Sequence, residues 1–220
     1  MARVIQLKPG KVQWNLTDIA FLYPPDVFTG AFDNEKLEAK HREQMTKKLD
    51  HLQSALAAEA DPLMAMLKLH KRDHLRFLCN NIEEFRKAGR LEESLITLYT
   101  RLNTPFSSDG NADLWNELFE ACDRKKLYEH GSPITFSSAT VYRGSISGFQ
   151  SSLIWTPERA TAERIARKWQ DPNLGGGTMY EVDVSKGDVL VFLKQRRGDE
   201  LILAPECIRS ATIRDFSVRG

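Results

Sequence analysis

Three residues in the second half of the chain have the types and settings that bind or transform a charged ligand. Arg143 ends a β-forming run and precedes Gly144, so the backbone can turn there while the guanidinium makes paired hydrogen bonds to a phosphate or carboxylate. Thr156 stands before Pro157 at a predicted helix start, and Glu200 opens an apolar run. Taken singly, each has an ordinary interpretation, as a solvated strand-end arginine, a helix cap and a solvated acid.

Short strands are predicted to position these residues. After Gly131 the chain contains runs rich in β-branched and aromatic residues and bounded by turn-forming residues, which is typical of strands and tight turns. These runs are ITFSSATVYRG, GTMYEVDV, DVLVFL, DELILAP and ATIRDFSV. One helix is expected to interrupt them, with Thr156 as its N-cap and Pro157 at its first helical position. Its apolar stripe comprises Ala162, Ile165, Ala166 and Trp169.

The first half of the chain has helical periodicity instead. From Asn34 to about Leu127 the apolar residues recur at helical spacing, which predicts roughly five amphipathic helices. The clearest stripes are Met45, Leu49, Leu52 and Leu56 on one helix and Leu75, Leu78, Ile82 and Phe85 on another. Asn111 is predicted to cap a last helix. We therefore expect a mainly helical N-terminal region over residues 1–130 and a β-rich core with one helix over residues 131–220.

Composition limits what the molecule as a whole attracts, so any electrostatic attraction must be local. The 220 residues include 31 basic and 30 acidic side chains, so no field of the whole molecule favours nucleic acid or an anionic membrane. No apolar run approaches the roughly 20 residues of a membrane span. The 3 cysteines are distant in sequence and form no CxxC pair, which suits a reducing compartment. We predict a soluble cytoplasmic protein with no membrane partner, while secretion without a cleaved signal stays an alternative.

Other candidate motifs do not favour a site. His70 and His74 stand four apart on a predicted helix, but the HExxH glutamate and an obvious third ligand are missing, so no metal is expected. The run Gly175-Gly176-Gly177 lacks the Lys-Ser/Thr of a phosphate-binding loop, which favours a flexible connection. No serine occupies the GxSxG motif of a nucleophile elbow.

Taken together, the order of Arg143, Thr156 and Glu200 resembles the ADP-ribosyltransferase fold of the Arg–Ser–Glu type. This branch includes many bacterial toxins and phage-encoded transferases. The resemblance covers roughly residues 135–217 and is carried by Tyr142-Arg143-Gly144, IWTPERATAERIA and GDELILAP. It implies an α+β protein in which a split β-sheet core follows a helical N-terminal half.

The resemblance also implies a role for each matching residue. The residues that would contact NAD, the substrate, are Arg143 and Gly144, together with the ring of either Trp155 or Tyr180 against nicotinamide. Glu200 would be the catalytic carboxylate, because cleavage of the nicotinamide–ribose bond passes through an oxocarbenium-like state that an ionised acid stabilises. Thr156 would brace that carboxylate, since a hydroxyl both donates and accepts.

Two positions depart from the pattern of this family. Ile154 stands where the middle motif usually has a serine, and two serines lie just upstream. Gly198 stands where transferases that modify arginine usually carry a second glutamate, with Asp199 beside it. The second departure disfavours an arginine acceptor.

The function expected from the resemblance is NAD-dependent mono-ADP-ribosylation of a macromolecule, without a metal, by a toxin-like phage or bacterial effector. The loop LKQRRGD, where relatives recognise their target, carries three cations, which hint at an acidic protein surface or nucleic acid. A protein acceptor is favoured. Two alternatives stay open, a catalytically inactive module that binds a protein and an NAD glycohydrolase.

Overall fold

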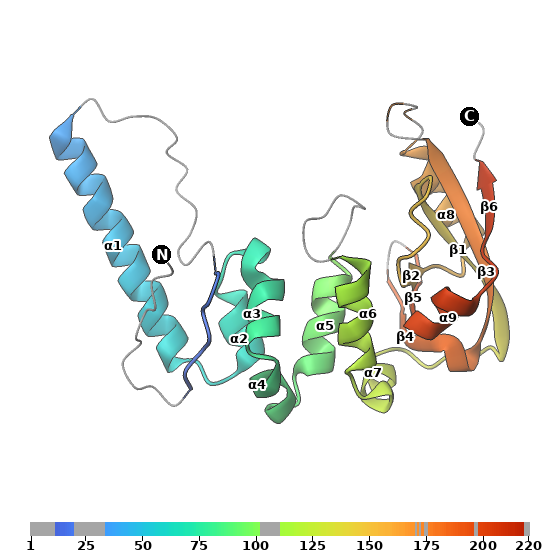
Figure 1. Cartoon of the computed structure of the whole chain (residues 1–220), viewed down its shortest axis with the longest axis horizontal. Helices are drawn as coiled ribbons and strands as arrows, with labels where there is room; N and C mark the ends of the chain where they lie inside the picture. The colour runs from blue at the N-terminus through green and yellow to red at the C-terminus, as the bar shows by residue number, and fades with distance from the viewer. Residues whose placement is uncertain are drawn as a thin grey trace. The chain divides into compact units, whose positions relative to one another are not determined.

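The computed structural model describes residues 12–19, 34–101, 111–169, 171, 173, 176–195 and 198–217. The chain divides into two compact units, Met1–Ser94 and Leu95–Gly220. Helices form the first unit in its described part, and the second combines helices with small antiparallel sheets (Figure 1). The α+β class predicted from the sequence is confirmed at this level. The proposed division between residues 130 and 131 stays a prediction.

The helices of the first unit bury one face each, as their periodicity predicts. They are α1 (Glu35–Ala58), α2 (Pro62–Leu67), the 3-10 helix η1 (Lys71–Asp73), α3 (His74–Asn80) and α4 (Ile82–Lys87), followed by α5 (Leu91–Tyr99), which crosses into the second unit. Asn34 caps α1 by accepting a hydrogen bond from the backbone of Lys36. The predicted stripe of α1 is buried at its C-terminal end, at Leu52 and Leu56. The Trp14 indole donates to the carbonyl of Leu56 at 3.0 Å.

The apolar stripe from Leu75 to Phe85, predicted to lie on one helix, belongs to two. The break lies at Asn81, whose φ of −123° and ψ of 23° depart from helical values. Its side chain accepts from the Asn15 backbone N–H at 2.7 Å and donates to the carbonyls of Asn15 and Phe77 at 3.0 and 2.8 Å. These bonds favour the break, and periodicity does not reveal it because the stripe continues across it.

The two histidines considered as a metal pair do not share a helix. His70 precedes η1 and accepts a hydrogen bond from Arg72 N, whereas His74 begins α3 with Nε2 3.0 Å from the carbonyl of Leu69. The prediction of a common helix is therefore wrong, because the chain turns between them.

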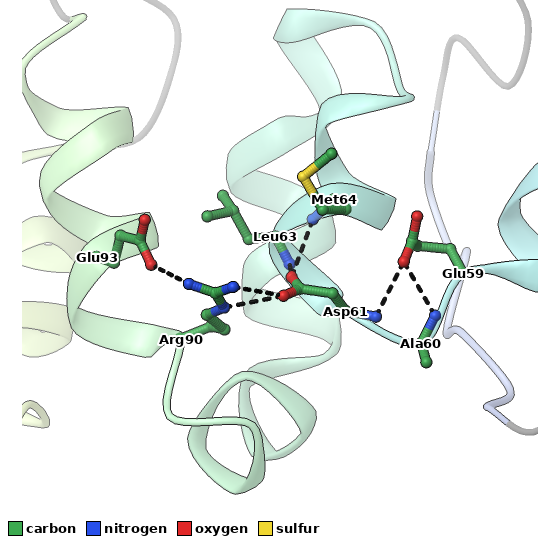
Figure 2. Close-up of polar contacts among 7 residues, drawn as sticks. All are labelled: Glu59, Ala60, Asp61, Leu63, Met64, Arg90 and Glu93. Atoms are coloured by element: carbon green, nitrogen blue, oxygen red, sulfur yellow. Dashed lines mark hydrogen bonds and ion pairs between the residues drawn. The ribbon is translucent and has the colours of Figure 1, made fainter.

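An ion-pair cluster joins the start of α2 to the start of α5 (Figure 2). Asp61 caps α2 by accepting from the backbone N–H groups of Leu63 and Met64 at 2.9 and 3.1 Å. Arg90 reaches the same carboxylate with Nε at 2.9 Å and Nη2 at 2.8 Å, and donates through Nη1 to Glu93 at 2.6 Å. Burial opposes ionisation of Asp61, but the Met64 N–H and the Arg90 guanidinium outweigh it and lower the pKa of the carboxyl.

Two three-stranded antiparallel sheets form the β part of the second unit. One has the order β1 (Ser138–Ile146), β3 (Gly177–Ser185), β6 (Arg214–Ser217), and the other the order β2 (Ile154–Trp155), β5 (Glu200–Leu203), β4 (Val189–Leu193). All five predicted strand segments contain a strand. Their content of β-branched and aromatic residues between turn-forming residues located them, and β4 and β5 are buried almost throughout.

The helices of the second unit are partly those expected. They are α6 (Ala112–Glu120), α7 (Arg124–Glu129), α8 (Arg159–Arg167), the 3-10 helix η3 (Lys186–Asp188) and α9 (Pro205–Ser210). The cap of α6 is confirmed, because the Asn111 side chain accepts from Leu114 N at 2.8 Å. The prediction of one helix after residue 130 is wrong, since α9 is a second one. Its six residues are too few to show a helical period.

Helix α8 packs on the β1–β3 face through two glycines (Figure 1). A Cβ at Gly144 would lie 2.0 Å from the carbonyl oxygen of Ala162, and one at Gly177 would lie 1.9 Å from that of Ala166. Any side chain at either position would therefore push the helix off the sheet. The predicted start of α8 needs correction: its N-cap is Glu158, and Thr156 lies before it at the end of β2.

Candidate functional site

Strand β2 joins the two sheets and lies between the strand that bears Arg143 and the strand that bears Glu200. Tyr142 of β1 and Thr156 exchange backbone hydrogen bonds of 2.7 and 2.8 Å. On its other side β2 pairs with β5, with Ile154 opposite Ile202. The same antiparallel register, continued by two residues, places Thr156 opposite Glu200. The strand bearing Arg143 and the strand bearing Glu200 therefore flank Thr156 on either side.

Arg143 is held by main-chain oxygens. Nη1 donates to the carbonyl of Ile154 at 2.9 Å, and Nε donates to the carbonyl of Phe149 at 3.3 Å. No carboxylate of the described residues lies within 4.0 Å of this guanidinium. Burial lowers the pKa of Arg143, and the nearby Tyr99 and Tyr180 hydroxyls oppose that shift. Because an arginine remains charged at neutral pH all the same, the side chain is an oriented cation without an anionic partner among the described residues.

The contact of Arg143 with residue 154 does not require the serine that the resemblance leads one to expect there. Arg143 uses the carbonyl oxygen of Ile154 and not its side chain, so this hydrogen bond is available to any residue type at position 154. The upstream serine contributes differently, because Ser152 Oγ lies 3.3 Å from the hydroxyl of Tyr99. The serine hydroxyl is thus part of the loop that leads into β2.

Glu200 is a half-buried acid at the start of the central strand β5. Its Oε2 accepts a hydrogen bond from Gln195 Nε2 at 2.9 Å. Burial raises the pKa of the Glu200 carboxyl above its ordinary value, and the Gln195 hydrogen bond opposes the shift. Within the described part of the chain, no basic side chain lies within 4.0 Å of it. Arg143 and Glu200 thus carry opposite charges close to β2 without forming an ion pair with each other.

Thr156 is buried, with 5% of its surface exposed. Its Oγ1 accepts from the backbone N–H of Glu158 at 3.2 Å, so the hydroxyl stabilises the turn into α8 from two residues before the N-cap. The hydroxyl hydrogen is not used in that bond. It can be donated to a carboxylate, which is the role the resemblance implies toward Glu200.

The three remaining predicted residues lie in the packed interior. The side-chain position of Gly144 is taken up by α8, so the close approach that this glycine permits is that of the helix backbone. Trp155 is 1% exposed and its Nε1 donates to the carbonyl of Ser152 at 2.9 Å. Tyr180 is 3% exposed, and its hydroxyl accepts from the N–H of Gly148 at 2.7 Å. In this conformation neither ring presents a face on which nicotinamide could stack.

Two residues of the site, Gln195 and Tyr99, were not predicted from the sequence. Gln195 lies in the loop singled out only for its cations, two of which, Arg196 and Arg197, lie outside the described residues. Tyr99 is the last residue of α5, and its hydroxyl accepts a hydrogen bond from the N–H of Leu153 at 2.8 Å. Tyr99 carries only the signal of a polar group after an apolar run, and Gln195 carries none among the charged residues of its loop.

Gly198 explains the absence of a second acid before Glu200. Its φ of +125° lies in a region that favours glycine, and a Cβ there would lie 3.2 Å from Glu158 Oε2 and 3.1 Å from Thr161 Oγ1. A glutamate at this position would be strained and crowded against the start of α8. The loop before β5 is therefore built around a glycine.

No metal centre or membrane span is found in the described residues. They contain no group of three or more His, Cys, Asp or Glu side chains arranged to hold a metal ion. None of the helices in the described ranges is both long enough and apolar enough to cross a bilayer.

Comparison with known proteins gives no match to a protein family, to a curated protein or to a solved structure.

Proposed function

We propose that this chain is an NAD-dependent mono-ADP-ribosyltransferase, which cleaves the nicotinamide–ribose bond and transfers ADP-ribose to a macromolecular acceptor. The supporting observation is the pair of half-buried, oppositely charged residues, Arg143 and Glu200, that flank β2 without neutralising each other. Perturbed charges are typical of functional sites, and neither of these two has an ion-pair partner among the described residues. The two small antiparallel sheets joined by β2 are compatible with the split-sheet core that we propose.

Each site residue has a defined task in this proposal. Arg143, already oriented by two carbonyls, binds a phosphate of NAD through its remaining N–H groups. Glu200 accepts a hydrogen bond from a ribose hydroxyl and stabilises positive charge on the ribose as nicotinamide departs with the bonding electrons. A nucleophile of the acceptor then bonds to the same ribose carbon and loses its proton. The Thr156 hydroxyl, which is not a donor to any described residue in this structure, would donate to Glu200 in the complex with NAD and favour the ionised carboxylate.

The decisive measurement is nicotinamide release from NAD, with radiolabelled NAD and cell lysate present to reveal the acceptor. The Glu200→Gln variant should lose about 100- to 1,000-fold in rate, because one stabilising group is removed from the transition state, while NAD binding persists. Glu206→Gln is the matched control, since Glu206 is an exposed acid of the same strand–helix region that pairs with Arg124 at 2.9 Å. Wild-type protein that neither binds NAD nor releases nicotinamide would refute the proposal.

A second candidate, a catalytically inactive module that binds a protein, is favoured by the buried rings of Trp155 and Tyr180. Calorimetric titration with NAD separates the two, because an inert module gives neither heat nor a thermal shift. The third candidate, an NAD glycohydrolase, predicts nicotinamide release without label on any macromolecule.

A further inference from the structure

An open pocket of about 560 Å³ lies at the end of β4, next to the residue that hydrogen-bonds Glu200. Its polar lining includes the basic residues Arg101 and Lys194, the imidazole of His130, the hydroxyl residues Thr97 and Ser132, and the amide of Gln195. All belong to the second unit. The pocket is thus a polar and basic hollow in one compact part of the molecule.

A glycine places the basic residues around this pocket. A Cβ at Gly131 would lie 2.9 Å from both the backbone nitrogen and the carbonyl oxygen of Phe192, so the turn after α7 lies directly on β4. The N–H of Ser132 donates to the same Phe192 carbonyl at 2.6 Å. This contact holds His130 and Ser132 beside the end of β4, where Lys194 follows.

The cations of the pocket are not neutralised by the described part of the protein. No carboxylate of the described residues lies within 4.0 Å of Arg101, His130 or Lys194. Arg101 and Lys194 carry two positive charges around one hollow, which exceeds the single charge of a carboxylate and suits a terminal phosphate, with its charge of about −1.5 to −2 and three acceptor oxygens. The volume falls within the range of roughly 300–1,000 Å³ typical of small-molecule sites and is larger than one side-chain carboxylate needs.

The strand order separates this pocket from Arg143. β5 is the central strand of its sheet, with β2 on one side and β4 on the other. Arg143 contacts β2, whereas the pocket lies at the end of β4. Gln195 lines the pocket and also donates to Glu200 at 2.9 Å. A ligand in the pocket would therefore lie next to the candidate acid but on the side away from Arg143.

We infer that this pocket binds a phosphorylated nucleotide, either free or at the end of a nucleic acid strand. The phosphate contacts Arg101 and Lys194, and the hydroxyls of Thr97 and Ser132 are available to the sugar. This binding does not depend on the transferase activity proposed above, so it can be tested without NAD.

The test uses the full chain and a short single-stranded oligothymidylate with a fluorescein at its 3′ end, with and without a 5′ phosphate. Fluorescence anisotropy should show tighter binding of the phosphorylated strand. The double variant Arg101→Gln/Lys194→Gln should lose about tenfold or more of that affinity, because two charge-assisted contacts disappear. The control Arg167→Gln/Lys168→Gln removes the same charge from the end of α8 and should leave binding unchanged.

Competition identifies the source of the phosphate. Adenosine monophosphate that displaces the strand at a similar concentration assigns the pocket to a free nucleotide, and a much weaker effect assigns it to a strand end. Equal binding of the two oligonucleotides, an effect of the control as large as that of the pocket variant, or equally potent displacement by polyglutamate would each overturn the inference.

Discussion

Two arginines, Arg90 in the first unit and Arg143 in the second, show how differently a guanidinium can be used. Arg90 contacts two carboxylates, Asp61 and Glu93, which cancel its charge (Figure 2). Arg143 donates to main-chain carbonyls, and no described carboxylate lies within 4.0 Å of it. A carbonyl orients a guanidinium without neutralising it. The first arginine therefore joins two helices, whereas the second keeps a charge that a ligand can use.

The acids of the two regions differ in the same way. Asp61 receives two backbone N–H groups and the Arg90 guanidinium, and its pKa is lowered. Glu200 receives one amide from Gln195, and burial raises its pKa. An ionic group that stabilises the fold is surrounded by partners of opposite charge and by hydrogen-bond donors. Among the described residues Glu200 has no ionic partner, which is the pattern expected where binding or catalysis takes precedence over stability.

The largest change expected from the comparison of the two arginines is in NAD affinity, and it tests whether a ligand uses the charge of Arg143. Arg143→Gln should weaken NAD binding by about 10- to 100-fold, because hydrogen bonds to a charged group contribute about 1.5–3 kcal/mol. Arg90→Gln removes the same charge from the first unit and should leave NAD affinity unchanged. Calorimetric titration of both variants measures the difference, and equal losses would abolish the distinction between the two arginines.

A smaller effect is expected on the free energy of unfolding, where the loss of Arg90 should matter more than the loss of Arg143. Arg90→Gln should lower the free energy of unfolding only modestly, because its ion pairs are partly exposed and screened by solvent. Arg143→Gln should change it less, since only two bonds to carbonyls are lost. Urea unfolding measures both. A double variant Arg90→Gln/Asp61→Asn that loses the full sum of the two single effects would show that the pair does not act as a unit.

The smallest effect concerns pH, and its sign differs between the two acids. The folded-state pKa of Asp61 is lowered, so its stabilisation is present above the unfolded pKa and is lost as pH falls through the folded pKa. The folded-state pKa of Glu200 is raised, so the folded state binds more protons between the two pKa values and stability falls as pH rises through that window.

At neutral pH, Asp61→Asn should therefore destabilise the protein and Glu200→Gln should stabilise it. Unfolding midpoints measured at neutral pH and at about pH 4 should show that the gain from Glu200→Gln shrinks in acid. A stabilisation that is the same at both pH values would mean that it does not come from the ionisation of Glu200.

Local patterns predicted the strands and most helices well, because the formation of a strand or helix depends largely on residues that are neighbours in sequence. The predicted N-cap of α8 was wrong, because Thr156 is a hydroxyl residue before a proline, as is typical of an N-cap, but does not cap the helix. Its backbone is instead paired with Tyr142 across the sheets, and the helix starts only after Glu158. Local patterns also joined α3 to α4, because the bonds from Asn81 to Asn15 connect positions far apart in the chain.

The candidate site was predictable in part for the same reason. Arg143 and Glu200 could be named from their motifs, and the register through β2 brings their strands to either side of Thr156. The residues that surround Arg143 and Glu200, and their contacts, could not be predicted from the sequence. Gly144 serves the packing of α8, Trp155 is buried, and Gln195 holds the acid, all through contacts that no short motif encodes.

The sequence by itself determined which charged residues the chain has, their order, and the strands and helices that carry them. It could not distinguish Arg90 from Arg143, because residue type and local pattern give each only a charged side chain; Arg143, predicted to end its strand, in fact lies inside β1. Only the tertiary structure decided that one is neutralised by Asp61 and the other is oriented by carbonyls. The reason is physical: the free energy of a charge depends on the partners and the water around it, and folding brings those partners from distant parts of the chain.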